Sequence, residues 1–175
     1  MNEGMLFLVQ TLFSLYIMAI VLRIWLQLAR ADFFNPLSQF IAKVTNPPLR
    51  PLEKVIPSRG RLNLAAVVLG IAVSVVAIYV RVLLVGANPD VLALLIIGVR
   101  YFISIVLQVV FWMLIIRAIL SWFSRGGNPL EYVLHQLTEP LLRPVRRFIP
   151  AIGGLDLSVL FVIIGIQFLR ILVGM

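Results

Sequence analysis

Two stretches of the sequence, NPLSQFIAKVTNPPLRPL at residues 35–52 and NPLEYVLHQLTEPLLRPV at residues 128–145, are copies of one pattern. The copies lie 93 residues apart (128 − 35 = 93), and the same offset brings Leu62-Asn63-Leu64 onto Leu155-Asp156-Leu157. A match that holds at a constant offset indicates an internal repeat. The chain is therefore predicted to consist of two repeats, residues 1–88 and residues 89–175.

Long apolar runs flank both copies of the pattern. Hydrophobic residues make up 62% of the 175-residue chain and charged residues only 13%, against about 45–50% and about 25% in soluble domains. Runs close to the length of about 20 residues that a membrane-spanning helix needs lie at residues 5–28, 62–85, 99–123 and 155–173. We therefore predict an all-α membrane protein with four transmembrane helices, arranged as two parallel span–loop–span repeats.

The third apolar run is longer than one perpendicular span requires, because it begins at Val91 and continues to Phe123. At about 1.5 Å per residue, it would reach about 50 Å as one helix. We expect Tyr101–Ile116 to form the centre of the span, and Val91–Gly98 to lie at the outer interface or to dip into it shallowly, with inclusion in the third span as the remaining alternative.

The distribution of basic residues predicts the orientation in the membrane. Of the 15 Lys and Arg residues, six lie in residues 29–61 and four in residues 124–154, the loops inside the repeats. Positive residues mark the cytoplasmic side of a membrane protein. Each repeat crosses the membrane twice, so both repeats have the same orientation, related by a pseudo-two-fold axis along the membrane normal. Both loops are therefore expected in the cytoplasm and both termini outside it.

The repeated loop is predicted to begin with a short amphipathic helix at the membrane interface. Asn-Pro at its start is typical of an N-cap followed by proline at the first helical position. Apolar residues then recur at helical spacing: Leu37, Phe40, Ile41 and Val44 in one copy, and Leu130, Val133, Leu134 and Leu137 in the other. Because proline lacks a backbone donor and restricts its predecessor, we expect Thr45–Pro51 and Thr138–Pro144 to break these helices.

A second short segment with an apolar and a basic face follows each break, as suits a helix in the lipid headgroup layer. The candidate interaction residues lie here and just beyond: Arg50, Arg143, Arg146, Arg147, Asn63 and Asp156. Arg50 and Arg143 recur at the same place in both repeats, each directly before a proline. Asn63 and Asp156 are predicted first as helix N-caps, with a ligand role as the alternative.

The residues that most enzymes and metal sites require are scarce in this chain. Cysteine is absent and His135 is the single histidine, so thiolate chemistry and paired imidazole ligands are excluded. His135 is expected to be an interfacial surface residue. No phosphate-binding glycine loop and no serine nucleophile elbow occur. We expect a protein that is not an enzyme, with no cofactor and no metal.

The paired pattern Asn-Pro-Leu, Thr-x-Pro-x-Leu-Arg-Pro, Ile-Pro, then Gly-x-(Asp/Asn)-Leu resembles the YggT family of small membrane proteins, also called YlmG-like. The likeness covers nearly the whole chain, but the first repeat departs from the pattern with Ser58-Arg59-Gly60-Arg61 and Asn63. The resemblance implies a multi-pass protein of the bacterial inner (cytoplasmic) membrane, linked with osmotic-stress tolerance, cell division or membrane-complex assembly.

Two classes of function follow from these features. The first is a non-catalytic protein that presents a basic cytoplasmic platform to anionic lipid headgroups or to a protein partner. The alternative is a small oligomeric channel or transporter subunit, which needs polar groups at membrane depth. Ala66, Gly70 and Ser74 form a stripe of small residues that favours close helix packing over a conduction path. The net charge of +8 is explained by membrane topology and lipid contact, so we expect no nucleic-acid partner. A homo-oligomer is compatible with either class.

Overall fold

The computed structural model describes residues 3–31, 35–58, 60, 62–88, 90–123, 129–149 and 156–174. Within these residues the chain is all-helical, with six helices and no strand. This result confirms the predicted all-α class. The order of the helices repeats, because a long apolar helix, a proline-containing amphipathic helix and a second apolar helix follow one another twice.

The first three helices have the local signals that the sequence predicts. Helix α1 (Glu3–Leu28) is a long apolar helix, and α2 (Pro36–Val55) follows it. Asn35 caps α2, because its side-chain oxygen accepts a hydrogen bond from the Ser38 N–H at 2.8 Å. Helix α3 (Leu64–Val85) is capped by Asn63 and ends at Gly86, which has a left-handed φ of 79°.

The fourth helix corrects one expectation. Helix α4 runs without a break over Val91–Phe123, 33 residues, so Val91–Gly98 is not a separate interfacial segment. The reason is tertiary packing, since Gly98 lies directly against Val75 of α3. A glycine allows two helix backbones to approach closely, and this contact holds the first turns of α4 beside α3.

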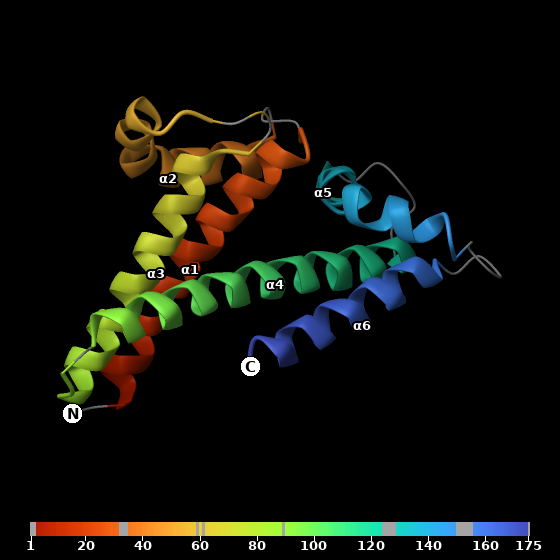
Figure 1. Ribbon diagram of the computed structural model, residues 1–175. Coiled ribbons are helices and arrows are strands. Elements are labelled where there is room, and N and C mark those ends of the chain that lie inside the picture. The colour runs from red at the N-terminus through yellow and green to blue at the C-terminus, as the bar shows by residue number, and fades with distance from the viewer. Residues whose placement is uncertain are drawn as a thin grey trace.

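The expected breaks in the amphipathic helices are a second correction. Helix α2 continues through Pro47, Pro48 and Pro51, and α5 (Pro129–Arg146) continues through its two internal prolines. The ribbon bends within both helices instead of ending (Figure 1). Proline kinks a helix that tertiary contacts hold on both sides. The hydroxyl of Thr45 donates to the Ile41 carbonyl at 2.7 Å, a back-bond that also favours bending.

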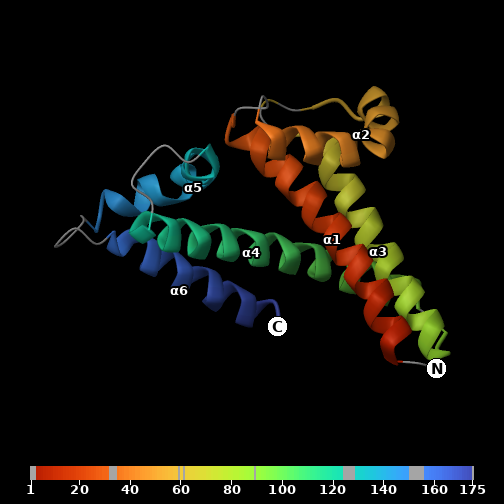
Figure 2. The same ribbon diagram turned by 180° about the vertical axis from the view of Figure 1, so that it is seen from behind.

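The two repeats together form a V (Figures 1 and 2). Helices α1 and α3 lie side by side in one arm. The other arm contains α6 (Leu157–Leu172) and the second half of α4, whose first half packs on α1 and α3. The chain passes from α3 to α4 at the vertex, whereas α2 and α5 lie at the open end (Figure 1). The two arms thus bring the two amphipathic helices to the same end of the molecule.

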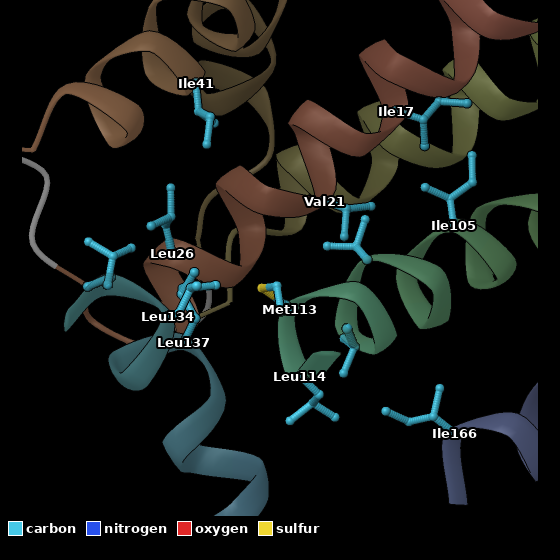
Figure 3. Packing of buried hydrophobic residues seen from close by; sticks show 14 of the residues in the cluster. Ile17, Val21, Leu26, Ile41, Ile105, Met113, Leu114, Leu134, Leu137 and Ile166 are labelled. Carbon is cyan, nitrogen blue, oxygen red and sulfur yellow. The ribbon is translucent and has the colours of Figure 1, made fainter. Parts of the chain in front are cut away.

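The hydrophobic core follows the contact between the arms. Ile17 and Val21 of α1 lie toward Ile105 and Met113 of α4, and Leu26 lies beside Leu134 and Leu137 of α5 (Figure 3). The same cluster includes Leu114 of α4 and Ile166 of α6. Ala66, Gly70 and Ser74, the stripe of small residues, are all buried. A methyl group at Gly70 would stand 2.3 Å from the Phe102 ring, so this stripe serves close helix packing.

Three helices are long and apolar enough to cross a membrane: α1, α3 and α4 over Val91–Ser121. Helix α6 is equally apolar but has 16 residues, fewer than the 19 expected for residues 155–173, of which 155 lies outside the described residues. The charged and proline-rich helices α2 and α5 do not meet this criterion.

Candidate functional site

The candidate residues of the sequence all lie at the open end of the V, on α2 and α5 or directly beside α3, α5 and α6. The side chains of Arg50 on α2 and Arg143 on α5 are exposed, as is that of Arg147 just after α5. None of the three forms an ion pair with another residue in the described part of the chain. These guanidinium groups are therefore available to an external anion.

Arg146 has a different environment. Its Nη1 donates to both carboxylate oxygens of Glu139, at 3.1 and 2.9 Å. Its Nε and Nη2 donate to Asp156 Oδ2, at 3.0 and 2.5 Å. One guanidinium thus joins α5 to the first residue before α6. Since its donors are used within the protein, Arg146 contributes less to an exposed basic face than the sequence suggested.

The same cluster reaches α4 through Arg117. This side chain, with 12% of its surface exposed, lies 3.7 Å from Glu139 Oε2 and donates a hydrogen bond to the Thr138 hydroxyl. His135 lies 3.6 Å from the same carboxylate and is largely exposed, as expected for a surface residue. The cluster therefore connects the end of α4, the kinked part of α5 and the start of α6.

Asp156 combines two structural roles. Its Oδ1 accepts hydrogen bonds from the Ser158 N–H and hydroxyl and caps α6, while Oδ2 accepts from Arg146. Burial on its own raises the pKa of this carboxyl, but the hydrogen bonds from Arg146 and Ser158 outweigh burial and lower its pKa below 3.8. The hydrogen bond to Asp156 raises the pKa of Arg146, and this effect is larger than the lowering caused by burial. The pair is charged at neutral pH.

The first repeat builds its cluster with different residues. Asn63, at the position of Asp156, caps α3 through Ala66 and donates to Glu53 at 2.6 Å and to Gln27 at 3.2 Å. Glu53 stands where the second repeat has Arg146 (146 − 93 = 53), and it attracts Arg23 of α1. In both repeats an arginine of the first helix lies near a carboxylate of the amphipathic helix: Arg23 near Glu53, and Arg117 near Glu139. The two glutamates do not occupy equivalent positions in the repeats.

Sequence reasoning missed Glu139 and Arg117 as members of this cluster. A signal was present for Glu139, because His135, Glu139 and Arg146 at positions i, i+4 and i+11 of one helix lie close to the same face. Nothing local points to Arg117, which precedes Glu139 by 22 residues and meets it only in the folded chain.

Two apolar cavities flank the contact between α1 and α4. One, of about 330 Å³, lies between α1, α2, α4 and α5 and includes Trp112 and Leu134. The other, of about 560 Å³, lies between α1, α4, α5 and α6 and includes Trp25 and Gly165. The indole N–H of Trp25 donates to the Leu137 carbonyl of α5 at 2.8 Å, a direct bond between the two repeats.

The chemistry available at this end is charge recognition. Among the described residues no group of three or more His, Asp or Glu side chains could hold a metal ion. The cluster around Glu139 pairs its charges internally, and the exposed arginines around it can bind anions. The described residues and this end of the molecule define an all-helical protein with apolar helices of membrane-spanning length and a charged, proline-kinked helix in each repeat.

Comparison with known proteins gives the family. The family model described as CCB3/YggT matches residues 2–84 and 96–175, so the chain belongs to the CCB3/YggT family, in agreement with the resemblance seen in the repeated loops. No solved structure matches the chain.

Relatives match over most of their length. The chain is 52% identical over 175 residues to the uncharacterized protein in the proC 3′ region of Vibrio alginolyticus, covering 98% of this chain and 94% of the relative. It is 41% identical over 158 residues to the uncharacterized protein YggT of Escherichia coli K12, covering 90% and 82%. An uncharacterized protein of Pseudomonas aeruginosa is 42% identical over 176 residues, covering 99% and 89%.

Proposed function

We propose that this protein is a non-catalytic, multi-pass protein of the bacterial inner membrane that presents exposed arginines on α2 and α5 to acidic groups at the cytoplasmic face. The acidic groups belong to anionic lipid headgroups or to a protein partner. The family resemblance connects this role with osmotic-stress tolerance, cell division or the assembly of membrane complexes.

The proposed orientation follows from charge. The helices α2 and α5, which lie at the open end of the V (Figure 2), carry five of the 15 basic residues. Basic residues are retained on the cytoplasmic side, so this end faces the cytoplasm and both termini lie outside.

The fourth span of this topology is α6. Its 16 residues extend about 24 Å at about 1.5 Å per residue, a few Å less than the bilayer core of about 30 Å. Local bilayer thinning accommodates such a mismatch at a modest cost. Arg100 of α4 donates to the Val173 carbonyl at the end of α6, which satisfies a carbonyl that the short helix leaves free.

One observation carries the proposal: Arg50 and Arg143 occupy the same place in the two repeats, and both are exposed. Neither has an ion-pair partner among the described residues. Lipid attraction of about 1 kcal/mol per basic residue requires only charge, whereas the rigid five-donor fork of arginine suits a specific carboxylate or phosphate. We assign fork-specific recognition to at least one of the pair.

Substitution by lysine and by alanine tests this assignment. Arg50→Lys, Arg50→Ala, Arg143→Lys and Arg143→Ala are introduced into a strain whose loss of the protein causes an osmotic-stress or division phenotype. We expect at least one lysine variant to fail in complementation although its membrane abundance is normal. Lys43→Ala, which removes an exposed charge from α2 at a position with no basic counterpart in α5, serves as the control. If all four arginine variants complement fully, neither arginine carries the function.

A further inference from the structure

We propose that the cavity between α1, α4, α5 and α6 binds an acyl chain of an anionic phospholipid whose phosphate contacts Arg143. This inference rests on the proposed placement in the membrane. It adds a defined lipid site to the general attraction between basic residues and the cytoplasmic leaflet.

The cavity has the size and lining of a site for an alkyl chain. Its volume is about 560 Å³, within the range of about 300–1,000 Å³ that is usual for small-molecule sites. Its walls are apolar and come from four helices, with Trp25 of α1, Leu141 and Val145 of α5, and Phe161, Gly165 and Leu169 of α6 among them. Along α6 the lining residues cover two turns, so the cavity runs along the helix.

Gly165 leaves one wall of this cavity open. A methyl group at this position would meet nothing within 4 Å. By contrast, methyl groups at Gly70 and Gly98 would collide with neighbouring residues. The space beside Gly165 is therefore accessible to a ligand and is not filled by the packing of the two arms.

A polar cavity adjoins the apolar one. Its volume is about 310 Å³, and it is lined by Ala29, Gln136, Glu139, Pro140 and Arg143. The two cavities share no lining residue but border the same two segments, since Ala29, just after α1, donates its backbone N–H to the Trp25 carbonyl, and Pro140 precedes Leu141 in α5. An apolar groove with a polar pocket on neighbouring residues suits a molecule with a long apolar tail and a polar head.

The charges in the polar cavity favour an anionic head. The carboxylate of Glu139 is held by Arg146 at 2.9 Å and by Arg117 at 3.7 Å, so it is compensated without Arg143. The Arg143 guanidinium has no ion-pair partner among the described residues and is exposed. A guanidinium binds phosphate oxygens through two parallel N–H donors, so the free group in this chamber is suited to a phosphodiester.

The position of Trp25 agrees with a headgroup boundary at this level. Tryptophan is enriched where the apolar core of a membrane meets the headgroups. Trp25 lines the apolar cavity, and its N–H donates to a backbone carbonyl of α5. A phospholipid of the cytoplasmic leaflet would place its chain beside the ring and its phosphate at the level of Ala29, just beyond the end of α1.

Quenching of Trp25 by brominated lipids measures occupancy of this cavity. The other two of the three tryptophans are replaced by phenylalanine, and the full-length protein is reconstituted into phosphatidylcholine vesicles. Dibrominated phosphatidylglycerol or dibrominated phosphatidylcholine is then added in increasing mole fraction. We expect half-maximal quenching at a roughly fivefold lower mole fraction of the brominated phosphatidylglycerol, the selectivity that one arginine at the headgroup level provides.

Two variants and a matched control locate the effect. Arg143→Ala should remove the preference for the anionic lipid but leave quenching by brominated phosphatidylcholine unchanged. Gly165→Leu, which fills the cavity and keeps every arginine, should reduce quenching by both lipids. Ala72→Leu adds the same side chain to an exposed face of α3 and should change neither curve.

Equal curves for the two lipids, or unaltered quenching in Gly165→Leu, would overturn the lipid site. If the reconstituted protein is dimeric and brominated lipid does not quench Trp25, the lipid site is also overturned. The cavity would then be assigned to contact with a second copy of the chain. Complementation by the arginine variants is scored separately, so the failure of either proposal leaves the other result interpretable.

Discussion

Adding one methyl group at Gly98 tests whether the start of α4 is packed into the protein. The new Cβ of Gly98→Ala would stand 2.5 Å from Cγ2, 2.9 Å from Cα and 3.1 Å from N of Val75. The backbone of Val75 cannot rotate away as a side chain can, so α3 and α4 must separate locally. Overpacking of this kind costs about 1–3 kcal/mol, and contact with backbone atoms places Gly98→Ala near the upper limit.

Alanine also favours a helix over glycine by about 1 kcal/mol, which offsets part of this cost. We therefore expect Gly98→Ala to lower the free energy of unfolding by about 2 kcal/mol, from a cost of about 3 less a gain of about 1. Gly165→Ala measures the gain in helix propensity alone, because its methyl group meets nothing within 4 Å. This variant should raise the free energy of unfolding by up to about 1 kcal/mol.

Denaturant unfolding in detergent micelles, followed by circular dichroism, compares the two variants with the wild type. The difference between them should be about 3 kcal/mol in favour of Gly165→Ala. If Gly98→Ala is as stable as Gly165→Ala, the close approach of α3 and α4 is refuted. Such a result would instead favour residues 91–98 as an interfacial segment outside the packed helices.

Three further predictions concern orientation, charge and the contact between repeats. Because the chain contains no cysteine, a single introduced cysteine reports which side of the membrane its position faces. An impermeant thiol reagent added to spheroplasts should label Asn88→Cys but not Phe148→Cys. The reverse pattern would overturn the orientation. Asp156→Asn should keep the N-cap but lose the ion pair to Arg146. The pKa of Asp156 is lowered in the fold. The wild type should therefore have a higher free energy of unfolding than Asp156→Asn at pH values above the ordinary carboxyl pKa, and this difference should disappear as the pH falls through the lowered pKa. A constant difference at all pH values in a denaturant titration would contradict this. Trp25→Phe removes a hydrogen bond between the repeats and should lower the free energy of unfolding by about 1 kcal/mol, measured against the wild type in the same unfolding assay. An unchanged free energy of unfolding would show that this hydrogen bond does not stabilise the protein.

The features predicted correctly from the sequence are local. Hydrophobic runs of sufficient length predicted α1 and α3 to within a few residues. Asn63 and Asp156 cap α3 and α6, as their place before an apolar run indicated. A cap depends on a side chain and the backbone N–H groups of the next few residues, so a single sequence contains all the required information.

The course of the amphipathic helices was wrong because local preference was overruled. Proline alone disfavours a helix interior, and the prolines after Thr45 and Thr138 therefore predicted breaks. The helices continue as kinked helices, since contacts with α1 and α3 in one repeat and with α4 and α6 in the other hold both parts of each. Such contacts between distant segments are not visible in a local pattern.

The sequence by itself determined the membrane-compatible composition, the repeat, the helix types and the family, because these depend on composition and short-range order. Tertiary structure decided which charges are available. Arg143 and Arg146 look alike in the sequence, yet Arg146 is bound by Glu139 and Asp156, whereas Arg143 is exposed. Glu139 and Arg146 both belong to α5, whereas Asp156 precedes α6 and meets Arg146 only when α5 packs on α6. An arginine is available to an external anion when the fold places no carboxylate of the protein beside it. Whether a carboxylate lies within reach depends on distances in the folded chain, which the order of residues does not show.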